Sequence, residues 1–304
     1  MNPRYKNTAG RDTRLLLIGG GDVAFRLLAF LPQKWRVAAL VREGPQVARL
    51  RSAGVRVVIG DLDDPGTLTR LAGCADRIVY SAPPAPDGDR DPRLERALAA
   101  LAVGRVPRSL VYISTSGVYG DHQGAHIAET APLRTASPRA RRRLAAERLL
   151  RDWGRRLGVA TSILRAPGIY AADRLPVARI RAGTPAIEAT ADSYSNHIHA
   201  DDLARACVLA LFRARGGRAF NVCDDQPLRM GDYFDAVADH FGLPRPPRLP
   251  RDAVRSRVEP MLWSFMAESR QLDNQRARRE LRLRLLYPTV ACFLESTDAA
   301  DTHT

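Results

Sequence analysis

The chain has 304 residues, of which 45% are hydrophobic and 26% are charged, and this composition is typical of a folded globular protein rather than a disordered one. Its formal net charge of +14 comes from arginines scattered along the chain, with Lys6 and Lys34 as the only lysines, and this scatter argues against a nucleic-acid-binding face. No apolar run approaches the roughly 20 residues that span a bilayer, so we expect a cytoplasmic protein with no membrane partner.

The first half of the chain alternates apolar runs with amphipathic stretches, which is the pattern of a parallel sheet wrapped by helices. The predicted strands are 15–18, 37–41, 55–59, 77–81, 109–114 and 159–164. The predicted helices are about 22–32, 45–53, 65–73, 91–103 and 138–157. We therefore expect an α/β protein built on a Rossmann-type, doubly wound parallel sheet.

Beyond residue 164 the alternation is interrupted by proline-containing segments, and the next predicted elements are a helix at about 201–213, a strand at 219–223 and a helix at about 230–241. We assign 14–166 and 196–224 to a nucleotide-binding domain, and 167–195 and 225–290 to a smaller C-terminal substrate lobe. The leader 1–13 is predicted to be disordered and 291–304 to be a frayed tail.

A glycine-rich turn joins the first predicted strand to the first predicted helix. It reads G-x-G-x-x-A, with Gly19 allowing the tight turn, Gly21 letting a pyrophosphate approach the backbone, and Ala24 packing closely on the strand. The helix that begins at Asp22 and Val23 directs its free N–H groups toward the phosphates. This turn predicts a bound nicotinamide dinucleotide.

The residues after the next strands indicate which dinucleotide is bound. Arg42 follows the second strand, where an NAD-specific protein usually has a carboxylate, and it is suited to a 2′-phosphate. We expect NADP, although Glu43 leaves NAD open. Further cofactor contacts are predicted at the ends of the third, fourth and sixth strands: Asp61, Leu62, Ser81, Ala82, Pro83 and Pro167.

Four motifs then occur in a characteristic order: YISTSGVYG at 112–120, LRAPGIY at 164–170, NHIHADDL at 196–203 and FNV at 220–222. From about residue 14 to 288 the chain resembles the extended short-chain dehydrogenase/reductase superfamily, the NAD-dependent epimerase/dehydratase group. The resemblance implies an oxidoreductase, epimerase or dehydratase acting on a small molecule such as a sugar or nucleotide sugar. Homodimers are common in that superfamily, so a homodimer is a further expectation.

The resemblance also implies site residues. Thr115, three residues before V-Y-G, corresponds to the hydroxyl that holds the substrate oxygen. The superfamily's proton-transfer pair, Tyr-x-x-x-Lys, aligns with Arg139 and Arg143, and no Tyr-x-x-x-Lys exists anywhere in the chain. Arginine stays protonated at physiological pH and cannot act as a general base. The chain thus resembles an atypical branch, in which Arg143 can still donate hydrogen bonds to the cofactor ribose.

This departure leaves three interpretations open. Another hydroxyl takes over proton transfer, with Ser116, Tyr119 and Tyr170 as candidates, although Tyr119 also fits a packed aromatic residue. Alternatively, the chemistry needs no strong protein base. In the third interpretation the protein is a non-catalytic NADP sensor, similar to the NmrA-type regulators, which also lack the pair.

The chain offers weak candidates for metal sites. His197 and His199 alternate along one predicted strand, but no third ligand is evident, and Asp201 or Asp202 is better explained as the cap of the next helix. The cysteines are far apart and form no C-x-x-C pair: Cys74, Cys207, Cys223 and Cys292. We therefore expect no metal ion and no disulfide framework.

Overall fold

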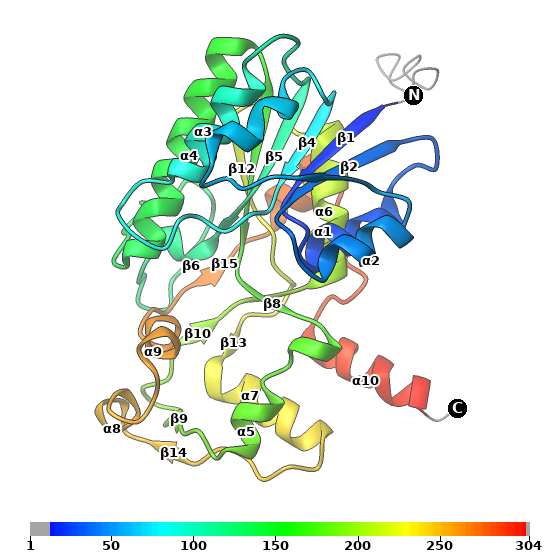
Figure 1. Ribbon diagram of the computed structural model, residues 1–304. Coiled ribbons are helices and arrows are strands. Elements are labelled where there is room, and N and C mark those ends of the chain that lie inside the picture. The colour runs from blue at the N-terminus through cyan, green and yellow to red at the C-terminus, as the bar shows by residue number, and fades with distance from the viewer. Residues whose placement is uncertain (1–12, 302–304) are drawn as a thin grey trace.

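The computed structural model describes residues 13–301, and its centre is one parallel sheet with the strand order β12-β7-β5-β4-β1-β2-β3 (Figure 1). The strands are β1 (Arg14–Ile18), β2 (Arg36–Val41), β3 (Arg56–Ile59), β4 (Arg77–Tyr80), β5 (Ser109–Thr115), β7 (Ala160–Ala166) and β12 (Arg218–Asn221). The chain order reverses between β1 and β4. In open parallel sheets the crevice at such a reversal is where ligands bind.

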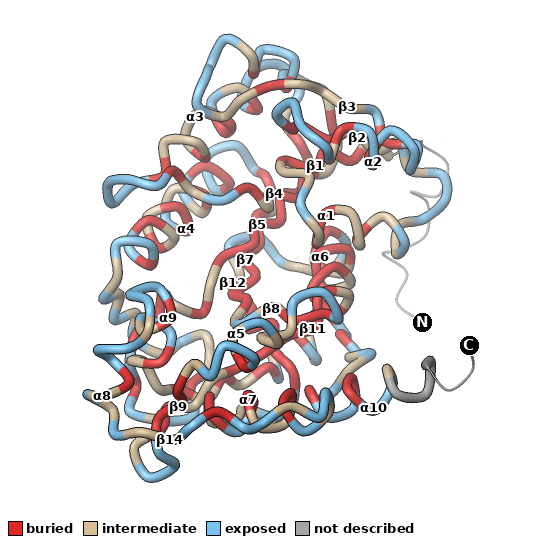
Figure 2. The backbone as a smooth tube through the Cα atoms, turned by 60° about the horizontal axis from the view of Figure 1, so that its bottom comes forward, coloured by how far each residue is buried: buried red, intermediate tan, exposed pale blue. Residues whose placement is uncertain are grey.

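Helices cover both faces of this sheet. One face packs against α1 (Asp22–Leu27), α2 (Gln46–Ser52) and α6 (Ala200–Arg213). The other packs against the 3-10 helix η3 (Pro65–Leu71), α3 (Pro92–Leu101) and α4 (Pro138–Leu157). Because the central strands are covered on both sides, they read as continuous apolar runs rather than alternating ones. Figure 2 shows the central strands as buried, whereas the outer surfaces of the helices are largely exposed.

The smaller lobe has a core of its own below the carboxyl end of the sheet (Figure 1). Its helices are α5 (Val177–Arg181), α7 (Met230–His240), α8 (Arg251–Arg255), α9 (Pro260–Met266) and α10 (Val290–Asp301). Short strand pairs join them: β8 (Gly168–Tyr170) with β11 (His197–His199), β9 (Ala186–Ile187) with β14 (Arg248–Leu249), and β10 (Tyr194–Ser195) with β13 (Leu228–Arg229).

Short elements connect these parts. They are η2 (Leu28–Phe30), η4 (Ser116–Tyr119), η5 (Ala172–Arg174), the π-helix η6 (Ala277–Leu281), and the paired strands β6 (His126–Ile127) and β15 (Gln271–Leu272). Among the described residues no helix is long and apolar enough to cross a membrane.

The predicted strands are confirmed to within two residues at either end, but four sequence predictions are wrong in part. The predicted helix at about 65–73 is the 3-10 helix η3. The frayed tail is instead α10 up to residue 301, because Phe293 and Leu294 are buried in the core of the smaller lobe. Residues 277–283, which we assigned to that lobe, pack against α6 in the core of the sheet. The first helix changes to 3-10 at Leu28. The predicted leader, apart from residue 13, lies outside the described residues.

Candidate cofactor and active site

The turn after β1 fixes the backbone through its glycines. Gly19 has a φ of +102°, and a Cβ there would lie 2.9 Å from the Ala82 backbone nitrogen. A Cβ on Gly20 would lie 2.5 Å from Cγ1 of Val41, which is too close for any side chain. Gly21 differs, because a Cβ there would meet nothing within 4 Å. The turn is therefore closed toward the protein and open on the side of Gly21.

A cavity of about 580 Å³ lies at this turn, at the carboxyl ends of β1, β2 and β4. The predicted cofactor residues that line it are Gly19, Gly21, Asp22, Arg42, Asp61, Leu62, Ser81, Ala82 and Pro83. Two other predicted contacts do not line it: the Val23 side chain is buried in the core, and Pro167 lies beyond the end of β7. The cavity coincides with the crevice at the strand reversal, so the residues present fit a dinucleotide.

Two guanidinium groups stand on one wall of this cavity. Arg42 is exposed, and Arg49 of α2 lies with its guanidinium carbon 3.7 Å from the centre of the Phe25 ring. Gln46 lies between them in sequence and donates a hydrogen bond of 2.9 Å to the Arg42 carbonyl. Sequence reasoning missed Arg49, although it is three residues after Gln46 and so shares one face of α2 with it. This wall is suited to a phosphate group.

Three acidic residues, Asp61, Asp63 and Asp64, follow β3. Asp61 lines the cavity, and its Oδ1 accepts a hydrogen bond of 2.9 Å from the Asp63 backbone N–H. Asp63 itself accepts two hydrogen bonds of 3.0 Å from Nε of Arg93, which lowers the pKa of its carboxyl group. Asp64 caps η3, because its side chain accepts from the Gly66 N–H. Asp61 is thus the carboxylate left to face a ligand.

Asp22 has a second role beside its place in the cavity wall. Its carboxylate accepts from Nε of Arg26 at 2.8 Å, and the same guanidinium donates to Asp201 of α6 at 2.9 Å. The N-cap of α6 is His199, whose Nδ1 accepts from the Asp201 N–H, so the predicted aspartate cap is wrong. Arg26 therefore ties the glycine-turn helix to the helix that follows β11.

The end of β5 carries the predicted substrate hydroxyl. Thr115 is half-buried, and its Oγ1 accepts a hydrogen bond of 3.1 Å from the Gly117 N–H, which leaves its O–H free to donate. Ser116 is only 5% exposed. Of these two hydroxyls, Thr115 is the one accessible to a ligand.

The two tyrosines considered for proton transfer are buried and hydrogen-bonded. The Tyr119 hydroxyl donates to Oδ1 of Asn221 at 2.7 Å and accepts from Arg165 at 2.9 Å, and burial raises its pKa to about 12. Tyr170 is 1% exposed, and burial also raises its pKa. Both hydrogen-bond partners of the Tyr119 oxygen are thus protein groups, which favours a packing role, and a catalytic role for Tyr119 stays a prediction.

Comparison with known proteins agrees with this geometry. The model of the NAD-dependent epimerase/dehydratase family matches residues 16–223. The chain belongs to this family. No curated protein matches the chain at a significant level. The family is NAD-dependent, which agrees with a dinucleotide site at the glycine turn.

Solved structures of the same fold extend over nearly the whole chain. A functionally unknown conserved protein from Silicibacter pomeroyi is 30% identical, with a TM-score of 0.78 over 96% of this chain and 100% of that one. A putative NAD-dependent epimerase/dehydratase from Methylobacillus flagellatus is 25% identical, with a TM-score of 0.72 over 96% and 100%. UDP-glucuronic acid 4-epimerase from Bacillus cereus, solved with UDP-glucuronic acid and NAD, is 18% identical, with a TM-score of 0.73 over 96% and 100%.

Against the family pattern, the start of α4 is the main departure. Arg143, at the lysine position, points back toward the sheet and donates to the Tyr112 hydroxyl at 2.8 Å and the Ile113 carbonyl at 3.1 Å. Arg139, at the tyrosine position, is exposed, and its guanidinium carbon lies 5.3 Å from the centre of the Phe265 ring of α9. Neither group can accept a proton near neutral pH.

The middle of α4 is fixed by a buried ion pair. Glu147 is fully buried and accepts from Nη2 of Arg165 on β7 at 2.7 Å and from Oγ of Ser114 on β5 at 2.7 Å. These bonds hold the helix against two strands of the sheet. The first turns of α4 therefore project over the strand ends from a fixed base.

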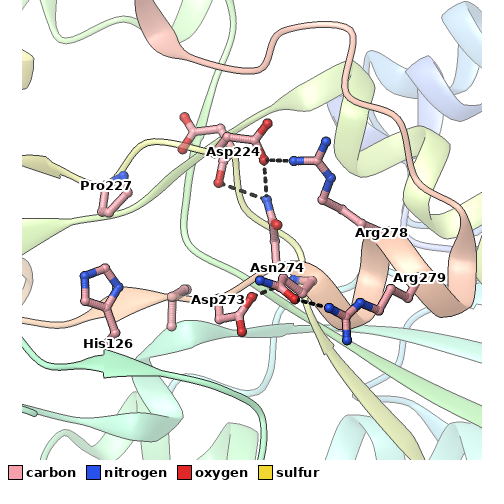
Figure 3. Close-up of a pocket in the computed structure, with 10 residues that line it drawn as sticks. His126, Asp224, Pro227, Asp273, Asn274, Arg278 and Arg279 are labelled. Atoms are coloured by element: carbon pink, nitrogen blue, oxygen red, sulfur yellow. Dashed lines mark hydrogen bonds and ion pairs between the residues drawn. The ribbon is translucent and has the colours of Figure 1, made fainter.

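A second cavity, of about 730 Å³, lies away from the glycine turn, between the β12–β13 connection, β6 and the start of η6. Figure 3 shows its polar lining, in which Arg278 donates to Asp225 at 2.8 Å and Asn274 joins the same carboxylate. Its arginine and amide groups are largely satisfied by neighbouring protein groups. The cavity does not include any residue predicted for the site.

The two strand histidines are buried among aromatic rings. His197 lies 4.2 Å from Tyr233 and His199 lies 4.2 Å from Tyr287, measured between ring centroids. Burial lowers the pKa of each to about 4. No group of three or more His, Cys, Asp or Glu side chains within the described range is arranged to hold a metal ion. Both histidines thus serve the packing between the sheet and the smaller lobe.

Proposed function

We propose that the protein is an NADP-dependent oxidoreductase or epimerase/dehydratase that exchanges hydride with a small hydroxyl or carbonyl compound, such as a sugar or nucleotide sugar. The observation that carries this proposal is the cavity beside Gly21, which is open where a diphosphate approaches and has Arg42 and Arg49 on one wall. NADP supplies the hydride chemistry when bound. Two guanidinium groups favour a 2′-phosphate over a bare ribose hydroxyl.

Residues of the chain would bind the cofactor and orient the substrate. Gly19 and Gly21 let the diphosphate approach the backbone, and Asp61 faces the adenosine end. The Thr115 hydroxyl donates a hydrogen bond to the substrate oxygen. Since neither Arg139 nor Arg143 accepts a proton, the proton of a substrate hydroxyl is exchanged with solvent water. This arrangement gives slower chemistry than a positioned base, which contributes about 10²–10⁴-fold.

Titration calorimetry with NADP⁺, NADPH, NAD⁺ and NADH tests the cofactor proposal. We expect both NADP forms to bind at least about 100-fold more tightly than the NAD forms, as two charge-assisted contacts imply. Turnover is then followed by cofactor absorbance with sugars, nucleotide sugars and alcohols, comparing the wild type with Thr115→Ala. Failure to bind any pyridine nucleotide overturns the proposal.

A second candidate is a non-catalytic NADP sensor. It is favoured by the same departure from the family: arginines at both proton-transfer positions, together with buried Tyr119 and Tyr170. This candidate predicts NADP binding without turnover of any substrate, and no effect of Thr115→Ala. It also predicts that NADP changes the affinity for a protein partner, which pull-downs with and without NADP measure.

A further inference from the structure

The start of α4 gathers guanidinium groups that no carboxylate neutralises. Within the described part of the chain, no acidic oxygen lies at ion-pair distance from Arg139, Arg142 or Arg143. Their neighbour Arg141, on another side of the helix, does have such a partner, Asp89 at 2.9 Å. Two of the three arginines without an acidic partner, Arg139 and Arg143, occupy the positions of the proton-transfer pair.

This arrangement is unfavourable in the protein alone. The first turn of a helix carries the positive end of its dipole, which favours anions, yet the first turn of α4 has no acidic residue. Protein groups packed around the Arg139 side chain and the charges of Arg143 and Arg142 lower the pKa of Arg139, although the residue as a whole is exposed to solvent. A bound anion would offset both the dipole and the mutual repulsion.

Only one of the three side chains is available to a ligand. Arg142 is 9% exposed and donates to the Gly88 carbonyl at 2.8 Å, and Arg143 is held by Tyr112 and Ile113. Arg139 is exposed, and its contact with a ring of α9 leaves its N–H donors without an acceptor among the described residues. Its planar fork of donors matches a carboxylate or phosphate.

The position of Arg139 relates it to the substrate rather than to the cofactor diphosphate. It lies four residues before Arg143 and so on the same helix face. Arg143 reaches Ile113, two residues before Thr115. Because α4 begins beyond the carboxyl end of β5, Arg139 lies one helical turn farther out from the sheet than Arg143 does. That is the side on which a substrate oxygen held by Thr115 would lie.

We propose that Arg139 binds an oxyanion group of the substrate, a carboxylate or a phosphate, and so makes the site selective for anionic substrates. This inference rests on the proposed function for the placement of the substrate. It assigns to the tyrosine position a binding role in place of proton transfer.

The test is calorimetry on matched probe pairs, with the protein first saturated with NADP⁺. The pairs are lactate with propane-1,2-diol, glucuronate and glucose 6-phosphate with glucose, and UDP-glucuronic acid with UDP-glucose. We expect at least one anionic probe to bind about tenfold or more tightly than its partner without that anionic group, as a charge-assisted hydrogen bond implies. Preference for glucuronate or for glucose 6-phosphate distinguishes a carboxylate from a phosphate.

Arg139→Gln should remove this preference, and Arg139→Lys should keep part of it. Arg141→Gln removes the same type of side chain from another side of the same helix and should leave the preference for anionic probes unchanged. Equal binding within every pair, binding of no probe at all, or an unchanged preference in Arg139→Gln would overturn the inference. Each titration is repeated without NADP⁺, and each variant is titrated with NADP⁺ alone. If the wild type does not bind NADP⁺, the proposed function is contradicted. If it binds NADP⁺ but shows no preference for anionic probes, only the proposed role of Arg139 is contradicted.

Discussion

The glycine turn after β1 and the first turns of α4 stand at the same edge of the sheet, yet they relate differently to the family. The turn depends on backbone geometry, such as the φ of +102° at Gly19, that few residues satisfy. The start of α4 depends on which side chains the helix carries, and arginines occupy both positions of the proton-transfer pair. Binding and chemistry are therefore separable: side chains can be exchanged on a fixed helix without disturbing the fold that holds the cofactor.

The largest effect is expected where α4 is anchored. Glu147→Ala leaves the buried Arg165 without its carboxylate, so we expect a loss of about 3–5 kcal/mol in the free energy of unfolding. Urea denaturation measures it, and Arg148→Ala, on the exposed side of the same helix, is the control. A small loss of stability in Glu147→Ala would contradict the view that α4 is a fixed helix on which side chains can be exchanged.

The next effect concerns the cofactor wall. Removing both guanidinium groups in Arg42→Gln/Arg49→Gln should weaken NADP⁺ binding by at least about 100-fold, since each charge-assisted contact is worth about 1.5–3 kcal/mol. NAD⁺ affinity should change little. Arg51→Gln/Arg56→Gln removes two exposed arginines that do not line the cavity and is the control matched for net charge. An equal loss for NAD⁺ would mean that the wall does not recognise the 2′-phosphate.

A smaller effect is expected at the open side of the turn. Gly21→Leu meets no protein atom within 4 Å at its Cβ, so the folded state tolerates it, but the new side chain stands where the diphosphate approaches. We expect cofactor affinity to fall about 10- to 100-fold, as for an overpacked contact. The melting temperature of the cofactor-free protein should stay close to that of wild type. Gly216→Leu, which is exposed and not in the cavity lining, should change neither quantity.

The smallest effect is expected at Tyr119. Tyr119→Phe removes bonds to Asn221 and Arg165 and should cost about 1–2 kcal/mol of stability. With its pKa raised to about 12, Tyr119 stays protonated at neutral pH in the folded protein. The pH profile of any turnover between about pH 6 and 9 should therefore be the same in Tyr119→Phe. If Tyr119→Phe instead loses one limb of the pH profile, Tyr119 takes part in proton transfer.

The limits of the sequence prediction have identifiable causes. Arg49 was missed because a guanidinium on an amphipathic helix has the sequence signature of ordinary solvent exposure, and only the packing of α2 against β2 turns it to the cavity. The tail was predicted wrongly because its acidic residues suggest solvent exposure. Phe293 and Leu294 are buried only because they pack in the core that α7 also forms. Tyr119 remained a candidate because its partners Asn221 and Arg165 are distant in sequence.

The sequence by itself determined the strand–turn–helix order, the glycine turn, the cofactor class and the absence of Tyr-x-x-x-Lys, because each is written in local periodicity or in a short motif. Only the tertiary structure decided which hydroxyls are buried, that Arg143 turns inward while Arg139 stays exposed, and which basic groups share the cavity wall. These properties depend on contacts between residues far apart in the chain, and burial and hydrogen bonding arise only when those residues pack together.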